Sequence, residues 1–463
     1  MRAESHGKKE MARLREISLI WADRVFLGVV LAAAPLFLFP RARYSWVGIV
    51  LGGMLVARGA IWGRFLERTP LDWGIGVLGL MILATCFVVP DIKFSVGKIA
   101  GALYGILLYY AAVAVIRTER AIKAGLYAFI LVGVALAAFG VVGTLILPEE
   151  AFAKMLPGIA KSLPKHNWAL PGAEAGFNPN AVGGSLLWVI PLALFLAGAM
   201  LGKGKRAAAE TLVRGEEGGQ GGSTRLPGLL LLSLASVILL AALFLSQSFG
   251  IWIAFMLSLW LVGLSPKWKV WSLAGALVLC GAIYAIRPLR RAIGPLAITG
   301  ISGTGATIVQ GNVVRVKIEQ RYGYWTAGVA AIRKAPVFGV GMKRLRLDPG
   351  ISYEGAHAHN QFITTGAELG IPGLVAYIAI LIGAGWMAWV VWKRSRDRWM
   401  RAAATGLIAG QLAFHIFGLG DAITLGSKPS ALFWVSLALI TAIYKKTQAE
   451  AAGFNPRRGE GAG

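Results

Sequence analysis

The chain of 463 residues is 56% hydrophobic and only 15% charged, with a mean hydropathy of +0.65. This composition is too apolar for a soluble globular protein, so we expect an integral membrane protein. The formal net charge is +25, which in a soluble protein would favour nucleic-acid binding. Here most Lys and Arg residues lie in short segments between apolar runs, as topology signals do. We therefore expect anionic membrane lipids as partners and no nucleic acid.

Apolar runs of about 20 residues, long enough to cross a bilayer as a helix, recur roughly twelve times along the chain. The expected fold is therefore all-α, a polytopic membrane protein with about twelve transmembrane helices. The predicted spans are 18–39, 46–63, 71–90, 99–116, 124–147, 181–201, 227–246, 249–265, 269–286, 371–392, 402–418 and 429–445.

Basic residues between the spans indicate the orientation. Alternate connections carry most of them, including the clusters at 117–123, 203–206 and 393–401 and the tail at 445–458. The positive-inside rule places these connections in the cytoplasm. Because the number of predicted spans is even, both termini are expected on the same, cytoplasmic side.

Three parts follow from this topology. Residues 1–286 are predicted to hold nine spans, with an outer loop at 148–180 and a flexible, glycine-rich cytoplasmic linker at 202–226. Residues 287–370 form a second and larger outer loop. Residues 371–463 hold the last three spans and the cytoplasmic tail.

The large outer loop is basic, and long loops are exempt from the orientation rule, so its charge needs another explanation. One explanation is contact with anionic lipid headgroups, and the other is a site for a phosphate-bearing substrate. Arginines at the start of the loop lie near a helix end, where contact with headgroups is the ordinary role. The basic residues of the loop are Arg287, Arg290, Arg291, Arg315, Lys317, Arg321, Arg333, Lys334, Lys343, Arg344 and Arg346.

Local structure within the loop can also be predicted. The spacing of apolar and small residues predicts a helix over Val313–Lys334 that ends near Pro336. A second helix is expected from Gln361 to a break at Gly370–Gly373, because a proline that closely follows a glycine can begin a new helix. The segment is therefore predicted to be a helix-turn-helix at membrane depth.

Several short motifs follow one another in this region. They are Arg321-x-x-x-Trp325, the run Ala335–Gly341, and His359-Asn360 followed by Gly370-x-x-Gly373; Phe177-Asn178-Pro179-Asn180 precedes an earlier span. In this order, and together with the hydropathy profile, they resemble the signature region of the O-antigen ligase and O-antigen polymerase superfamily.

The resemblance implies a glycosyltransferase with a GT-C-like fold and a large helical periplasmic loop. Such an enzyme transfers polysaccharide from undecaprenyl diphosphate on the periplasmic face of the bacterial inner membrane, without a metal or other cofactor. For a ligase the acceptor is a sugar hydroxyl of lipid A-core, and for a polymerase it is the growing repeat-unit chain. The resemblance maps the essential histidine of the family onto His359 and a catalytic periplasmic arginine onto Arg321.

Residue chemistry agrees with these roles. Breaking a glycosyl-diphosphate bond places negative charge on the leaving phosphate, which guanidinium groups stabilise. The acceptor hydroxyl loses a proton, which a histidine can accept near neutral pH. Glu354 and Glu368 lie too far apart in sequence to indicate a metal site or a glycosidase pair.

Other residues are candidates for substrate binding, each with an alternative. His357 either shares the role of His359 or is only its neighbour, and Trp325 lies in an outer loop, where it could contact glycan. Asp421, just beyond a span, could orient His359 or be neutralised by Lys428. The full set of binding candidates is Asn360, His357, Arg290, Arg315, Trp325, Asn180 and Asp421.

The chain departs from the family pattern at one position. Relatives often carry Ser-Arg-Gly where this chain has Ser248-Phe249-Gly250, so an expected arginine is absent. Arg321, for its part, could pair structurally with Glu319 or Asp348.

A transporter of the same lipid would need ionisable residues spread through the spans and broken helices in two matching halves, which the sequence does not clearly show.

Overall fold

The computed structural model describes residues 2–38, 46–63, 65–145, 179–201, 225–246, 248–263, 312–345 and 358–453. Within these ranges the regular structure is helical and no strand occurs, which confirms the all-α expectation. The residues group into two compact units. The first unit comprises Met1–Leu126, Tyr322–Arg394 and Thr424–Gly463, and the second comprises Tyr127–Arg321 and Ser395–Ile423. Each unit therefore joins segments that are distant in the sequence.

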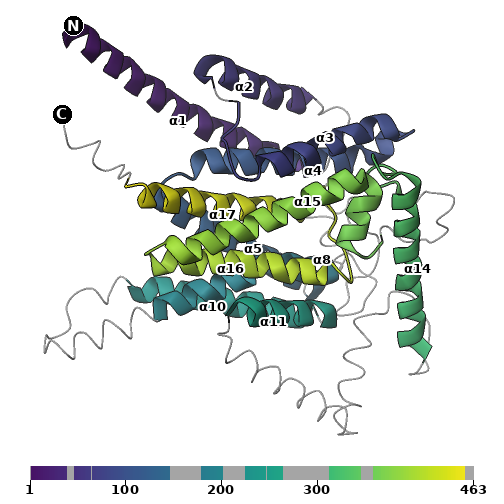
Figure 1. Cartoon of the computed structure of the whole chain (residues 1–463). Coiled ribbons are helices and arrows are strands. Elements are labelled where there is room, and N and C mark those ends of the chain that lie inside the picture. Colours follow the sequence, from purple (N-terminus) through teal and green to yellow (C-terminus); the bar gives the residue numbers. More distant parts are fainter. Residues whose placement is uncertain are drawn as a thin grey trace, which may run out of the picture. The chain divides into compact units, whose positions relative to one another are not determined.

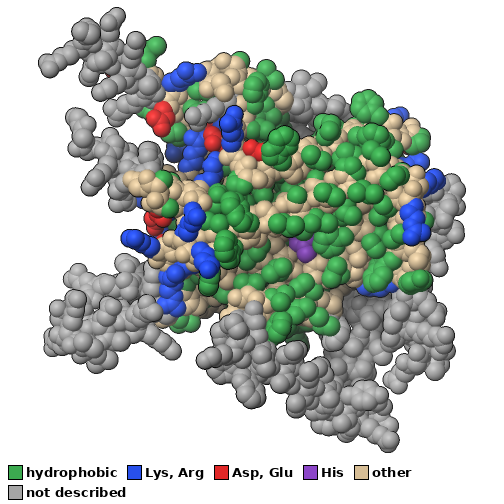
Figure 2. Space-filling model, viewed as in Figure 1, with side chains coloured by type: hydrophobic (Ala, Val, Ile, Leu, Met, Phe, Trp, Pro, Cys, Tyr) green, Lys and Arg blue, Asp and Glu red, His purple; other side chains and the backbone are tan. Residues whose placement is uncertain are grey.

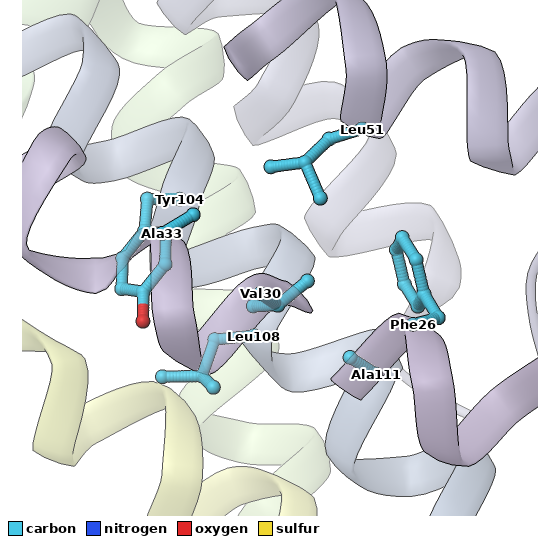
Figure 3. Packing of buried hydrophobic residues seen from close by; sticks show 7 residues of the cluster. All are labelled: Phe26, Val30, Ala33, Leu51, Tyr104, Leu108 and Ala111. Atoms are coloured by element: carbon cyan, nitrogen blue, oxygen red, sulfur yellow. The ribbon is translucent and has the colours of Figure 1, made fainter. Parts of the chain in front are cut away.

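The first unit is built around α4 and α15 (Figure 1). Helix α4 packs against α1 and α17, and α15 packs against α3 and α17. Figure 3 shows part of the interior, where Phe26 and Val30 of α1 lie among Leu51, Tyr104 and Leu108. The helices of this unit are α1 (Arg2–Leu38), α2 (Trp46–Trp62), α3 (Asp72–Val88), α4 (Ile92–Val115), α15 (Gln361–Arg394) and α17 (Ser430–Ala451).

The second unit packs α16 against α11, and α8 against α10, α11 and α16. Gly406 and Gly410 of α16 lie against the segment that follows α8, where an added Cβ would lie 2.6 Å from the backbone of Leu192 or Trp188. Glycines four residues apart commonly permit such contact between membrane helices. The helices are α8 (Pro179–Leu186), α10 (Arg225–Leu245), α11 (Phe249–Gly263) and α16 (Arg398–Phe417); α5 (Glu119–Leu145) and α14 (Asn312–Lys334) contribute residues to both units.

Within the described ranges, six helices are long and apolar enough to cross a membrane. Figure 2 shows the corresponding surface, on which hydrophobic side chains cover much of the face in view. The predicted span 269–286 lies outside the described residues, so a total of twelve stays a prediction. The six stretches are Leu14–Ala34, Ile92–Val115, Glu119–Gly140, Asn180–Leu201, Pro227–Phe244 and Gln361–Arg394, and shorter apolar helices cover Val50–Trp62, Asp72–Val88 and Gly250–Gly263.

A network of ion pairs in the first unit contains the buried side chains of Asp23 and Arg58 and the partly exposed side chains of Arg117 and Lys445. The carboxylate of Asp23 on α1 accepts hydrogen bonds from Arg58 of α2 at 2.8 Å and from Arg117 at 2.7 Å. Arg117 also pairs with Glu67 at 2.8 Å, and Lys445 of α17 lies 3.5 Å from the same carboxylate. Because a charge in an apolar interior is costly when unpaired, these pairs restrict how the helices can pack.

Helix α15 consists of two helices that meet at Gly370. The backbone there has φ 72° and ψ 179°, which interrupts the helix, and Pro372 lies in the first turn of the following piece. In Figure 1 the short and long pieces of α15 point in different directions. The predicted break at Gly370–Gly373 is therefore confirmed. We call residues 361–369 the short helix.

The segment 335–341, which precedes the short helix in the sequence, completes the hydrogen bonding at this break. The N–H groups of Val340 and Gly341 donate to the carbonyls of Ala367 and Glu368, at 2.8 and 3.2 Å, and the N–H of Ile371 donates to Pro336 at 2.7 Å. Carbonyls at the end of a helix have no partner within it, so the loop acts as a cap. Backbone hydrogen bonds thus join the run from Ala335 to Gly341 to the end of the short helix.

Replacing Gly370 by Ala should destabilise the protein. A side chain at φ 72° is strained, and its Cβ would collide with the backbone carbonyls of Pro336 and Val337. We expect a loss of about 1–3 kcal/mol in unfolding free energy, measured as a lower Tm in detergent micelles. Gly385→Ala in the same helix is the matched control, because nothing lies within 4 Å of the added Cβ. Equal Tm values for the two variants would contradict this account.

Candidate functional site

Asn360 is the N-cap of the short helix. Its side-chain oxygen accepts hydrogen bonds from the backbone N–H groups of Phe362 and Ile363, each at 3.0 Å, and its carbonyl accepts from Thr364 at 2.9 Å. Asparagine is among the residues preferred at this position because it satisfies donors that the helix leaves open. The His-Asn pair of the motif therefore has a local reason: Asn360 begins the helix, and His359 is the residue immediately before it.

His359 is held in an uncommon backbone conformation beside an aromatic ring. Its φ is 48°, in the left-handed region that few residues other than glycine adopt. The imidazole is half-buried, and its centroid lies 5.1 Å from that of Tyr324 on α14, with 40° between the ring planes. Backbone strain of this kind often marks functional positions. His359 thus lies between the capped start of the short helix and the ring of Tyr324.

The other end of the short helix carries a buried ion pair. The ammonium of Lys98 on α4 lies 2.7 and 2.6 Å from the two carboxylate oxygens of Glu368. The exposed fraction is 11% for the Lys98 side chain and 4% for that of Glu368. A second donor, the N–H of Lys343, makes a third hydrogen bond to this carboxylate, at 2.8 Å. Full pairing and hydrogen bonding is what allows such charges to remain buried.

Three of the predicted site residues gather at one turn in the second unit. Arg321 donates a hydrogen bond from its guanidinium to the carbonyl of Gly420. Asp421 follows Gly420 in the sequence. Its carboxylate accepts hydrogen bonds from the side-chain amide of Asn180, at 3.3 Å, and from the N–H of Ala422, at 2.8 Å. The turn after α16 thus brings together segments that are widely separated in sequence. Whether Asp421 orients His359 or is neutralised by Lys428 stays a prediction.

The remaining predicted residues have less structural detail. Trp325 lies on α14 with 36% of its surface exposed. Arg315 lies near the start of the same helix, and only its backbone is described. His357 and Arg290 fall outside the described residues. Their roles, and that of Phe249 at the start of α11, stay predictions.

Sequence analysis missed Tyr324 and the ion pair between Lys98 and Glu368. Lys98 and Glu368 are lone charges at the edges of apolar runs, and a charge in that setting needs a partner of the opposite sign. This signal could have raised the possibility of an ion pair. It could not have identified the pairing, since the two residues are 270 positions apart.

A comparison with protein families matches residues 234–378 to the O-antigen ligase family. This part of the chain is similar to that family. The resemblance to the O-antigen ligase and polymerase superfamily is therefore confirmed. No curated protein matches the chain.

The O-antigen ligase match covers the short helix and the residues that lead into it. His359, Arg321, Tyr324 and Glu368 lie within it, and so does the break at Gly370. The matched residues fill less than half of the chain. Asn180, Asp421 and Lys98 lie outside the match, so their link to the motif comes from the structure.

Removing the N-cap should loosen the start of the short helix. Asn360→Ala leaves the N–H groups of Phe362 and Ile363 without their acceptor, and we expect a cost of about 0.5–2 kcal/mol. Asn360→Asp keeps an acceptor oxygen and should retain most of the stability. Thermal unfolding in detergent micelles measures both variants. A Tm for Asn360→Ala equal to that of the unchanged protein would show that the cap contributes nothing.

Proposed function

We propose that this protein is an O-antigen ligase of the inner membrane, with both termini in the cytoplasm. It would transfer polysaccharide from undecaprenyl diphosphate to a sugar hydroxyl of lipid A-core on the periplasmic face, without a metal. The main support is His359, a half-buried histidine with a left-handed backbone at the start of a capped helix, within the residues that match the ligase family. The apolar helices fit a multi-pass membrane protein that acts on lipid-linked substrates.

In the proposed reaction, His359 accepts the proton of the acceptor hydroxyl. The hydroxyl oxygen forms a bond to the anomeric carbon of the donor glycan as the bond from that carbon to the phosphate oxygen breaks. Undecaprenyl diphosphate leaves with the bonding electrons. A positioned base of this kind accelerates a reaction by about 10²- to 10⁴-fold.

Arginines are proposed to stabilise the charge that develops on the diphosphate. A guanidinium group presents several N–H donors in a plane, which suits phosphate oxygens. Arg321 is the first candidate because it is exposed and lies within the family match. Arg290 and Arg315 are further candidates in the same basic loop. Phe249 stands where the resemblance leads us to expect an arginine, and the loop arginines are proposed to take the role of that arginine.

Asn360, His357, Trp325, Asn180 and Asp421 are proposed to surround the substrates. Trp325 offers an exposed aromatic face, which could stack on a sugar ring. The hydrogen bond from Asn180 holds the Asp421 carboxylate in one orientation. An O-antigen polymerase would use the same residues, and the two activities differ only in the acceptor.

Replacing His359 by Ala should lower transfer by about 10²- to 10⁴-fold, because the acceptor loses its base. The assay uses purified protein in nanodiscs with an undecaprenyl-diphosphate-linked glycan and lipid A-core, and mass spectrometry identifies the product. His6→Ala, which removes a histidine near the N-terminus, is the control and should keep full activity. Full activity of His359→Ala would end the catalytic proposal. Chain lengthening on the carrier lipid, without a lipid A-core product, would identify a polymerase.

Replacing Arg321 by Ala should lower kcat/KM by about 10²- to 10³-fold, as expected when one charge-stabilising donor is removed. Arg321→Lys should recover part of this loss, because lysine keeps the charge but not the planar set of donors. Arg333→Ala, an exposed arginine on the same helix, is the matched control. If Arg321→Ala and Arg333→Ala transfer glycan equally well, another residue holds the phosphate.

A further inference from the structure

Lys98 and Glu368 form a buried ion pair between α4 and the short helix. Lys98 reaches both carboxylate oxygens, and Lys343 adds a backbone hydrogen bond to one of them. One turn before Lys98 on α4, the hydroxyl of Ser95 donates a hydrogen bond to the carbonyl of Met342 at 2.7 Å. Helix α4 therefore contacts both the end of the short helix and the loop that caps it.

The short helix depends on these contacts for its position. At Gly370 the backbone turns away from the helical path, so the long piece of α15 does not continue its hydrogen bonding. The capping loop contacts the same end of the helix. Two residues directly after this loop extend the contact: the carbonyl of Met342 accepts a hydrogen bond from Ser95 of α4, and the N–H of Lys343 donates one to Glu368. The end that contains Glu368 is thus held by α4.

The opposite end of the short helix presents His359. Nine residues of helix extend about 13 Å and behave as a stiff rod, so a displacement at one end moves the other. Asn360 caps the start of this rod by accepting hydrogen bonds from the N–H groups of Phe362 and Ile363, and His359 directly precedes it in the chain. The position of the imidazole is therefore coupled to the contact between Lys98 and Glu368.

We propose that Lys98 and Glu368 are positioning residues: their ion pair docks the short helix on α4 and thereby places His359 for proton transfer. The catalytic part of this inference rests on the proposed role of His359. Neither residue touches the reacting atoms in this proposal. Lys98 lies outside the residues that match the ligase family, so the match alone does not assign it a role.

The test uses the full chain in nanodiscs with the variants Lys98→Met, Lys98→Arg and the double variant Lys98→Met/Glu368→Met. Lys123→Met is the matched control, because it removes an exposed ion pair with Glu119 in which the side chains are 43% and 47% exposed. Three quantities are measured. They are hydrogen exchange of peptides from 361–369, the rate at which diethylpyrocarbonate modifies His359, and kcat and KM for transfer.

Lys98→Met should accelerate exchange in the short helix by about 100-fold or more, because it leaves the buried Glu368 charge without its partner. Exchange in α17 peptides should stay unchanged. The rate of His359 modification should change, and kcat should fall by about 10- to 100-fold with KM preserved, since small displacements of a catalytic group have effects of this size. Lys98→Arg should restore all three quantities. The double variant should exchange more slowly than Lys98→Met, because no lone charge remains buried.

Three results would overturn the proposal. If Lys98→Met matches Lys123→Met in all three measurements, the pair does not position His359. If kcat falls while exchange and His359 modification stay unchanged, Lys98 acts on the substrate directly. If exchange accelerates equally in α17, the pair stabilises the whole unit and not the short helix.

Hydrogen exchange and chemical modification do not depend on turnover. If the unchanged protein transfers no glycan, the proposed function fails, while these two measurements still decide whether the ion pair docks the short helix and places His359.

Discussion

The left-handed backbone at Gly370 is the constraint on which the candidate site depends. It separates an apolar sequence into a short helix and a long one, and it leaves carbonyls at the end of the short helix without helical partners. The loop before the short helix supplies the missing N–H donors, from Val340 and Gly341. The glycines and the proline of this region are therefore explained by backbone geometry. His359 and Asn360 lie at the other end, the N-terminus, of the same short helix. The break at Gly370 separates this short helix from the long apolar helix that follows.

Charges inside the first unit show how an apolar protein uses polar groups. Glu368 is saturated by Lys98 and the N–H of Lys343, and Asp23 is shared between Arg58 and Arg117. Lys98 and Glu368 are 270 positions apart, whereas Asp23 joins α1 to α2 and to Arg117. Van der Waals packing alone gives weak specificity between apolar helices in a membrane, because lipid is equally apolar. Paired charges add specificity, since the wrong arrangement would leave a charge without a partner.

The O-antigen ligase match and the structure support the proposed activity in different ways. The match covers residues 234–378 and names a family whose members act on lipid-linked glycans. The structure adds the cap at Asn360, the ring of Tyr324 beside His359, and the turn where Arg321 and Asn180 bind neighbouring residues. Phe249 stands where the resemblance leads us to expect an arginine, so the phosphate-binding role is proposed for the arginines of the basic loop.

The sequence by itself determined the helical class, most element positions, the break at Gly370 and the family, because apolar runs, glycine and proline signals and short motifs are local in the chain. It could not identify the partner of Glu368, the ring beside His359 or the contacts of Asp421. Those contacts join residues as much as 270 positions apart, and many pairings of charges and helices are compatible with one hydropathy profile. Only the tertiary structure decided them, because the packing of helices determines which buried charge finds which partner.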